Sequence, residues 1–314
     1  MLIKDEKSLN EKQLIREFFS DVGSAYLADQ DIILGVGDDA AVIKNSKNQC
    51  SVLSIDTALS DIHFFSDMDP SDIAYRSVSI SLSDLLACGA KPSWFILSIT
   101  LEETSIDWLS KFKSGLEDIS SEFCIPLIGG DITKGPLSIT VQVGGYTSES
   151  DIIKRSTAND EDLIFVTGSI GKSFQSLLNY KEGKGENSSY TRPSLRKGVA
   201  PKLNGIASSA IDISDGLFQD LNEICKLSKK GAEVYLEKIP HPFGDDLDFS
   251  LLNKGDDYEI CFTAPKNFRE KISQISQEEN VRISEIGKIT NSNEIRFFNG
   301  KKEVLVGLDG YQHF

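Results

Sequence analysis

The sequence predicts a two-domain α/β protein with some α+β character, and three observations lead to that prediction. At 314 residues, the chain exceeds the usual size of a single hydrophobic core. Short apolar runs that suit strands alternate with amphipathic stretches that suit helices. A polar, charged stretch at 148–162 separates two such halves. We therefore expect an N-terminal domain over residues 1–147, a mixed sheet with flanking helices, and a C-terminal α/β sandwich over residues 148–314.

The first half is predicted to open with a helix over residues 8–20, where Ser8 and Glu11 form a capping box. Apolar runs at 31–37, 40–43 and 51–56 then indicate strands. A helix is expected from 69 to 88, because Pro70 suits a first helical turn and Gly89 suits the position after the end. The remaining elements are predicted as a strand at 94–101, a helix at 106–119, and strands at 125–131 and 137–146.

The second half repeats this alternation. Strands are expected at 162–168, 210–214, 232–236, 258–264, 283–289 and 294–299. Helices are expected at 172–180, 197–210, 217–230 and 267–278. The segment 181–194 offers little apolar surface to bury against the entropy of ordering, so we expect an exposed flexible loop there.

Charge and cysteine usage exclude several classes of protein. The formal charge of −15 disfavours nucleic-acid binding, which depends on basic surfaces that displace counterions. The five cysteines are odd in number and widely spaced, which disfavours a disulfide framework. The N-terminal residues lack the pattern of a signal peptide, and no run is long and apolar enough to span a bilayer. We expect a cytoplasmic protein with neither nucleic-acid nor membrane partners.

Two glycine motifs resemble nucleotide-binding loops but fail on spacing or context. At 166–173 the first glycine of a P-loop would have to fall on Val166. Residues 35–40 match the dinucleotide pattern G-x-G-x-x-A, but too few residues separate Ala40 from Asp56 to form a helix and a strand. Neither motif therefore predicts its usual ligand.

Aspartates recur at predicted strand ends and glycine turns. A single aspartate there is usually a turn or cap residue, but six recurrences favour a shared site. Carboxyl ends of strands in an α/β sheet face one crevice, so these side chains could converge. They are Asp38 and Asp39, Asp56, Asp84, Asp131, Asp212 and Asp215, and Asp256 and Asp257.

Such a gathering of carboxylates demands a cation. Close carboxylates raise one another's pKa unless positive charge is present, and Lys, Arg and His are sparse in these motifs. Oxygen ligands indicate a hard ion, and Mg²⁺ binds one or two carboxylates together with substrate phosphates. Zinc is disfavoured, because His63, His241 and His313 have no suitable spacing.

Taken together, the motifs resemble the thiamine-monophosphate kinase family, within an ATP-binding group that includes aminoimidazole ribonucleotide synthetase and selenophosphate synthetase. The resemblance spans nearly the whole chain, in the family's order. It is carried by GVGDDAAV, SIDTALSDIHF, AYRSVSISLSDLLACGAKP, LIGGDITKGPLSIT, IKRSTANDEDLIFVTG, AIDISDGLFQDL, GDDYEICF and GYQHF. The resemblance implies a homodimer formed through N-terminal sheets, with ATP and several Mg²⁺ ions in a cleft between the two domains.

The resemblance also implies roles for individual residues. Metal ligands would be Asp39, Ser54, Ile55 (through its carbonyl), Asp56, Asp84, Asp131, Asp212 and Asp215. The catalytic set would be Asp56, Asp84, Asp131 and Asp215, and ATP would contact Gly130, Asp131, Arg155 and Ser214. Thiamine monophosphate would contact His63, Asp256 and Tyr311, and an aromatic ring at Tyr311 suits a cationic thiazolium. His63 could equally be a polar edge or cap residue, and Tyr311 could simply anchor the C-terminus.

Three residues depart from the family's pattern: Ile55 replaces a frequent Ser or Thr, Ile132 a usual Thr, and Asp256 a common Glu. None removes a predicted metal carboxylate. The expected reaction is direct, in-line phosphoryl transfer to a phosphate acceptor, which is already largely dianionic and needs no strong general base. Two alternatives remain, another ATP-dependent synthetase of the same group and a non-catalytic nucleotide or metal sensor, and the sequence leaves open whether K⁺ assists.

Overall fold

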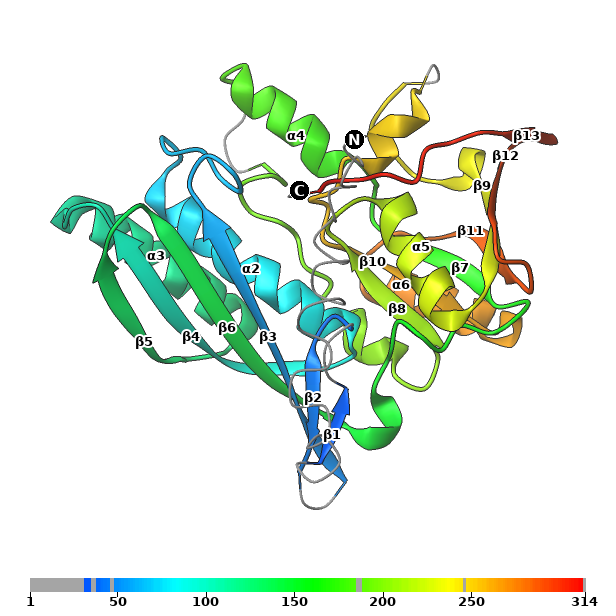
Figure 1. Cartoon of the computed structure of the whole chain (residues 1–314), viewed down its shortest axis with the longest axis horizontal. Coiled ribbons are helices and arrows are strands. Elements are labelled where there is room, and N and C mark those ends of the chain that lie inside the picture. The colour runs from blue at the N-terminus through cyan, green and yellow to red at the C-terminus, as the bar shows by residue number, and fades with distance from the viewer. Residues whose placement is uncertain (1–30, 35–37, 46–47, 185–187, 245–246, 313–314) are drawn as a thin grey trace, which may run out of the picture.

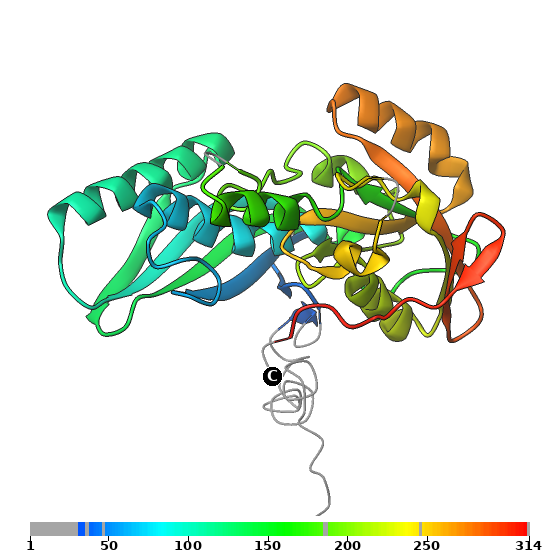
Figure 2. The ribbon, with the colours of Figure 1, turned by 90° about the horizontal axis from the view of Figure 1, so that it is seen from above.

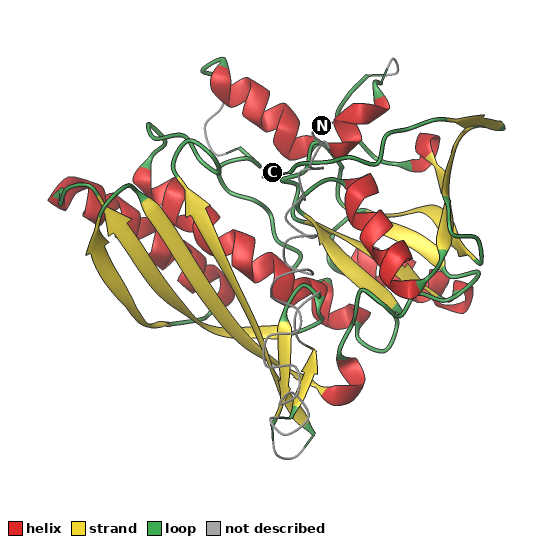
Figure 3. Cartoon of the chain, viewed as in Figure 1, coloured by secondary structure: helices red, strands yellow, loops and turns green. Residues whose placement is uncertain are grey.

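The computed structural model describes residues 31–34, 38–45, 48–184, 188–244 and 247–312 (Figure 1). The helix expected at 8–20 lies outside the described residues. Within them, the chain forms two mixed sheets with helices packed against them, which confirms the predicted α/β class (Figure 3). No helix in this part of the chain is both long enough and apolar enough to cross a membrane.

The first described sheet has the strand order β1-β2-β3-β6-β4-β5. β3 and β4 both run antiparallel to the central β6, and β5 runs parallel to β4. Helices α2 (Pro70–Ala87) and α3 (Ile106–Phe123) pack on one face, and the other face carries no described helix (Figure 2). The strands are β1 (Ile32–Leu34), β2 (Ala41–Lys44), β3 (Gln49–Leu59), β4 (Lys91–Leu101), β5 (Leu127–Lys134) and β6 (Ser138–Ser148).

The second described sheet has the order β13-β12-β9-β11-β7-β10-β8. Helix α5 (Leu217–Ser228) buries its apolar side chains in one core, whereas α6 (Arg269–Glu278) contributes Ile272 and Ile275 to the other. The α/β sandwich is therefore confirmed. Its strands are β7 (Leu163–Thr167), β8 (Ser209–Ile213), β9 (Gly231–Tyr235), β10 (Glu259–Ala264), β11 (Ile283–Thr290), β12 (Ile295–Asn299) and β13 (Lys302–Val304).

Helix α2 joins the two sheets. It begins at the predicted place, where Asp69 accepts a hydrogen bond from Ser71 N and Pro70 occupies the first turn. Small buried serines line this helix and let both halves of the chain approach it closely, and their hydroxyl groups are satisfied. Ser81 donates to the Val141 carbonyl of the first sheet, and Ser83 donates to Asp212 of the second. One apolar core consequently runs from the first sheet through α2 to the second.

Two predictions for the second half are wrong. Residues 197–210 do not form a helix, because Pro201 removes a donor and Gly205 turns the chain at φ +71°. A short 3₁₀ turn at Ala200–Leu203 leads into β8 instead. The segment 181–194 is not wholly exposed, since Tyr190 and Thr191 are buried and Arg192 is ion-paired with Asp72. Ring packing and ion pairs there supply the anchoring that composition alone did not indicate.

Candidate active site

Carboxylates from three distant segments meet between the two sheets. Asp39 lies between β1 and β2, Asp84 lies in the last turn of α2, and Asp212 lies on β8. Ligand oxygens of these three side chains lie within 4.8 Å of one another. Asp56 on β3 lies beside them, because its charge is among the causes that raise the pKa of Asp84. The structure thus brings together four of the predicted metal ligands.

Hydroxyl groups hold two of these carboxylates in place. Ser54 Oγ on β3 donates to Asp84 Oδ2 at 2.5 Å, and Ser83 Oγ on α2 donates to Asp212 Oδ2 at 2.8 Å. Ser83 is buried, and Ser54 is half-buried on the same face of β3 as Asp56. The carboxylate geometry is therefore built into the packing of β3, α2 and β8.

The electrostatics of this cluster call for a cation. Burial raises the pKa of Asp84 well above its usual range, and the charges of Asp56 and Asp212 raise it further. Hydrogen bonding from Ser54 opposes the rise without cancelling it. Carboxylates held this close in a buried position can all ionise when a hard cation sits among them. The donor set, made of oxygen atoms, therefore fits Mg²⁺.

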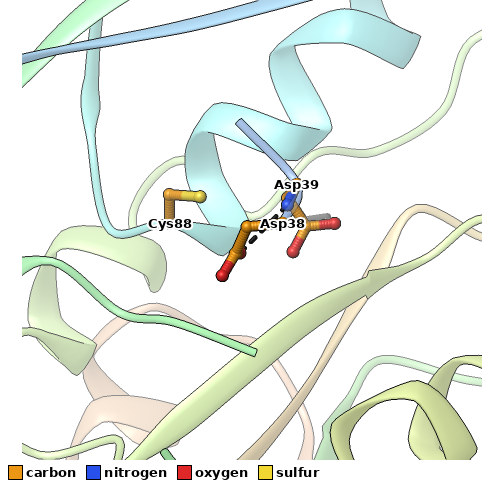
Figure 4. Close-up of side chains that lie close together, drawn as sticks. All are labelled: Asp38, Asp39 and Cys88. Carbon is orange, nitrogen blue, oxygen red and sulfur yellow. Dashed lines mark hydrogen bonds between the residues drawn. The ribbon is translucent and has the colours of Figure 1, made fainter. Parts of the chain in front are cut away.

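A second group adjoins the first, at the end of α2. Asp38, Asp39 and the thiol of Cys88 lie within the same 4.8 Å limit (Figure 4). Asp39 N donates to Asp38 Oδ1 at 3.0 Å. Burial, and then the nearby Asp38 charge, raises the pKa of the Cys88 thiol well above its usual range, so this sulfur stays protonated. The sequence reasoning missed Cys88, although its position four residues after Asp84 on a helix was a signal.

Arg155, from the second half of the chain, contacts both Asp38 and Asp39. Its guanidinium is ion-paired with Asp39, whose side chain is 1% exposed. Its backbone N lies 3.4 Å from Asp38 Oδ2. Burial raises the pKa of Asp38, and the Arg155 charge opposes that rise. A predicted ATP residue thus lies directly beside a predicted metal ligand.

Asp131 lies elsewhere. The register aligns Asp56 with Val141 and Leu97 on the buried face of the first sheet, and aligns Asp131 with Ser98 and Thr140 on the open face. Side chains directly opposite one another in a sheet share a face. Three strand spacings separate β3 from β5, which is roughly 14 Å. Within one chain, Asp131 does not join the Asp56 cluster.

Gly130 and Ile55 are also placed by the first sheet. A Cβ atom at Gly130 would lie 1.9 Å from the Leu97 carbonyl oxygen, and φ there is +156°, so only glycine fits this bulged strand. Ile55 presents its side chain to the open face and is 62% exposed. Its backbone carbonyl belongs to the same strand as Ser54 and Asp56.

His63 lies just after β3, where its carbonyl accepts a hydrogen bond from Arg76 Nε. The loop after β8 gathers the other predicted residues. Asp256 N donates to Ser214 O at 2.7 Å, and Tyr311 N donates to Asp215 O at 2.9 Å. Gln219 Nε2 donates to both Asp215 Oδ2 and the Tyr311 carbonyl. The C-terminal segment 305–312, which we call the strap, is therefore tied to the loop that follows Asp212 on β8. Between the strap and residues 248–254 lies an open recess of about 500 Å³.

The chain matches models of two domains of one protein family. The "AIR synthase related protein, N-terminal domain" model matches residues 37–147, and the corresponding C-terminal domain model matches residues 159–298. A thiamine-monophosphate kinase from Escherichia coli K12 is 36% identical over 323 residues, covering 97% of this chain and 98% of the relative. The chain belongs to the thiamine-monophosphate kinase family.

Solved structures agree with this family assignment. The crystal structure of thiamine-monophosphate kinase from Stenotrophomonas maltophilia K279a is 31% identical, with a TM-score of 0.75, and the match covers 88% of this chain and 94% of that one. A structure of AaThiL complexed with AMPPCP and TMP is 24% identical, with a TM-score of 0.81 over 100% and 99% of the two chains. The second likeness shows that the fold is shared.

Two more buried residues lie near the predicted site: Arg76, which the sequence reasoning missed, and Asp257, which it counted among the converging aspartates without giving it a role. Arg76 on α2 is 4% exposed and contacts the Asp256 carboxylate. Asp257 accepts hydrogen bonds from Gly171 N at 2.7 Å and Ser173 N at 3.1 Å, at the start of helix α4 (Lys172–Lys181). Arg76 had no signal of its own, because a lone arginine on a predicted helix is usually a surface residue.

Proposed function

We propose that this chain transfers the γ-phosphoryl group of ATP to thiamine monophosphate and forms thiamine diphosphate. The observation that carries the proposal is the meeting of Asp39, Asp84 and Asp212 from three distant segments at one point. Sequence identity to thiamine-monophosphate kinases over nearly the full length supports the choice of acceptor. A relative in fold that was solved with AMPPCP and TMP supports it further.

Mg²⁺ is the metal that the site fits. Asp39, Asp56, Asp84 and Asp212 would hold it on the buried side, with Ser54 and the Ile55 carbonyl from the same strand. A bound magnesium ion supplies neutralisation of phosphate charge and a fixed orientation for the phosphates. Asp215, three residues after Asp212, would bind Mg²⁺ at the open end of the cluster. An assay with and without KCl tests whether K⁺ assists.

The chain's own residues then position the reactants. Arg155 lies beside Asp39 and would meet the phosphates of ATP, with Ser214 on the neighbouring loop. The acceptor phosphate needs no general base, because it is already largely dianionic near neutral pH. His63, Asp256 and Tyr311 would contact the thiamine monophosphate, and the recess under the strap lies beside Tyr311. Catalysis on this proposal is positioning plus charge neutralisation, without a phosphoenzyme.

A homodimer completes the proposed site. The open face of the first sheet carries exposed apolar and aromatic side chains, including Ile55 and Tyr146. Packing this face against a second copy would bury those side chains and would carry Asp131 and Gly130 to the partner's nucleotide site. Residues 1–147 would thus provide metal, ATP and dimer contacts, and residues 148–314 would complete the ATP and acceptor cleft, in a cytoplasmic enzyme.

The test is an assay with ATP, Mg²⁺ and a panel of phosphomonoesters, in which ADP and the diphosphorylated product are both followed. Thiamine monophosphate should be turned over far faster than the other acceptors. Asp56→Asn and Asp215→Asn should each lower turnover by orders of magnitude with the fold intact, whereas Asp107→Asn, on the exposed face of α3, should have no effect. Turnover of a different acceptor would favour another synthetase, and ATP binding without any product would favour a sensor.

A further inference from the structure

Arg76 is a buried arginine whose guanidinium binds three segments that are far apart in the sequence. Its Nε donates to the His63 carbonyl at 3.0 Å, and its Nη1 donates to the Tyr190 carbonyl at 2.6 Å. Its Nη2 donates to Asp256 Oδ1 at 2.5 Å. The guanidinium also lies over the Tyr190 ring, 4.6 Å from its centroid. One side chain thus fixes three loops relative to α2.

Two of those loops carry residues that we assign to the acceptor. His63 Nδ1 accepts a hydrogen bond from Leu59 N at 3.1 Å, so the ring proton of neutral His63 lies on Nε2. Asp256 has φ +66°, and its backbone N is bonded to Ser214 O. The backbone of Asp256 is therefore set by the loop after β8, while the direction of its carboxylate is set by Arg76.

The two partners of the Arg76–Asp256 ion pair differ in exposure. The Asp256 side chain is 27% exposed, whereas the Arg76 side chain is 4% exposed, so the guanidinium holds the carboxylate from behind and leaves its outer side open. A buried arginine is retained where its planar group satisfies several acceptors at once. Lysine at this position could keep the ion pair but could not reach all three acceptors.

The same helix carries the metal carboxylate. Asp84 follows Arg76 by eight residues, which is about 12 Å along a helix axis. Helix α2 therefore connects the proposed metal cluster to the acceptor loops as one rigid element.

We propose that Arg76 is a positioning residue for the acceptor, which sets His63 and Asp256 relative to each other without touching the transferred phosphoryl group. This inference rests on the proposed function. It predicts that Arg76 governs the KM for thiamine monophosphate and leaves the KM for ATP nearly unchanged.

Arg192 provides a matched control. It anchors the loop that bears Tyr190, through ion pairs with Asp72 at 2.5 Å and Asp118 at 2.7 Å, and it lies over the Tyr75 ring. Within the described part of the chain, its guanidinium bonds to Ser71, Asp72 and Asp118 and not to His63 or Asp256. Arg192→Gln therefore loosens the same loop without disturbing the proposed acceptor residues.

The experiment compares Arg76→Gln, Arg76→Lys and Arg192→Gln in full steady-state kinetics, with thermal unfolding measured in parallel. Losing hydrogen bonds to a charged group corresponds to a roughly tenfold to hundredfold effect, so the acceptor KM of Arg76→Gln should rise at least about tenfold. The KM for ATP should stay within about twofold, Arg76→Lys should be intermediate, and Arg192→Gln should keep the wild-type acceptor KM.

An unchanged acceptor KM in Arg76→Gln, or an equal rise in both KM values, would overturn the inference. If Arg76→Gln does not fold, Arg76→Lys decides, and a wild-type acceptor KM in that variant is the overturning result. A wild-type protein that does not turn over thiamine monophosphate would instead overturn the proposed function, so the two failures are distinguishable.

Discussion

Ser83 on α2 donates a 2.8 Å hydrogen bond to Asp212 on β8, and both residues are buried. This contact joins the helix of the first half to a carboxylate of the second that we propose as a metal ligand. The site is therefore coupled to the way the two halves pack.

Ser83→Ala should lower the free energy of unfolding by about 1–3 kcal/mol, because a buried carboxylate oxygen loses its donor. The control is Ser79→Ala on the same helix, whose hydroxyl donates to the Tyr75 carbonyl one turn earlier and so stays within the helix. Denaturant unfolding of both variants measures the difference. Equal, small losses of unfolding free energy in the two variants would show that the Ser83–Asp212 hydrogen bond contributes no more to stability than the Ser79 hydrogen bond.

Asp84→Asn should abolish turnover and yet stabilise the metal-free protein. Burial and the charges of Asp56 and Asp212 raise the pKa of Asp84, so the ionised form is costly until a cation is bound. Thermal unfolding with and without MgCl₂ checks this expectation. The wild type should gain stability on addition of Mg²⁺, and the variant should gain much less. A variant that is less stable than wild type without metal and equally responsive to Mg²⁺ would contradict the proposed metal site.

Asp257 should make stability pH-dependent near neutrality. Burial raises its pKa to about 7, although hydrogen bonds from Gly171 N and Ser173 N oppose the rise. The folded state therefore holds a proton that the unfolded state loses at lower pH, and the free energy of unfolding falls as pH rises from the unfolded pKa toward 7 and then levels off. Between about pH 5.5 and about pH 8, this residue should account for a loss of roughly 2 kcal/mol.

The measurement is metal-free denaturant unfolding of wild type and Asp257→Asn at both pH values. Asp84 titrates with the same sign in both proteins, so the difference between them isolates Asp257. The variant should lose the part of the pH dependence due to Asp257. An identical pH dependence in the two proteins would refute the assignment.

Mixing two inactive variants tests whether Asp131 acts in the partner's site. Asp56→Asn and Asp131→Asn homodimers should each be nearly inactive. In a mixed dimer, one of the two sites would combine an intact Asp56 from one chain with an intact Asp131 from the other, and activity should return to about a quarter of the wild-type value in an equal mixture. No recovery after verified subunit exchange would show that Asp131 does not serve the partner's site.

A separate variant tests the dimer face itself. Ile96 lies on the open face of the first sheet, opposite Gln142, so Ile96→Asp should give a monomer of low activity. Ile106 on α3 is 79% exposed on the other side of that sheet, and Ile106→Asp should leave the mass and the activity unchanged. Sedimentation equilibrium gives the mass. A dimeric, active Ile96→Asp protein would exclude this face as the interface.

Local pattern determined much of the fold. The helix predicted at 69–88 is α2, at Pro70–Ala87, because Pro70 and Asp69 mark its start and Gly89 marks its end. The helix predicted at 197–210 is wrong. That prediction followed the spacing of the apolar residues, but Pro201 removes a donor and Gly205 turns the chain, so no helix forms there. Tyr190 and Thr191 are buried, although the sequence predicts an exposed loop there. The ion pairs of Arg192 with Asp72 and Asp118 anchor this loop, and local sequence does not reveal them because they join segments more than seventy residues apart.

The sequence by itself determined which residues could serve: aspartates at turns, an acidic balance that calls for a cation, and an ordered set of motifs that marks the family. Only the tertiary structure decided which of them meet. It placed Asp39, Asp84 and Asp212 at one point, put Asp131 on the opposite face of the sheet, and set Arg76 behind Asp256. The physical reason is that the face of a strand and the partner across a core depend on register and packing between distant segments, which local sequence does not encode.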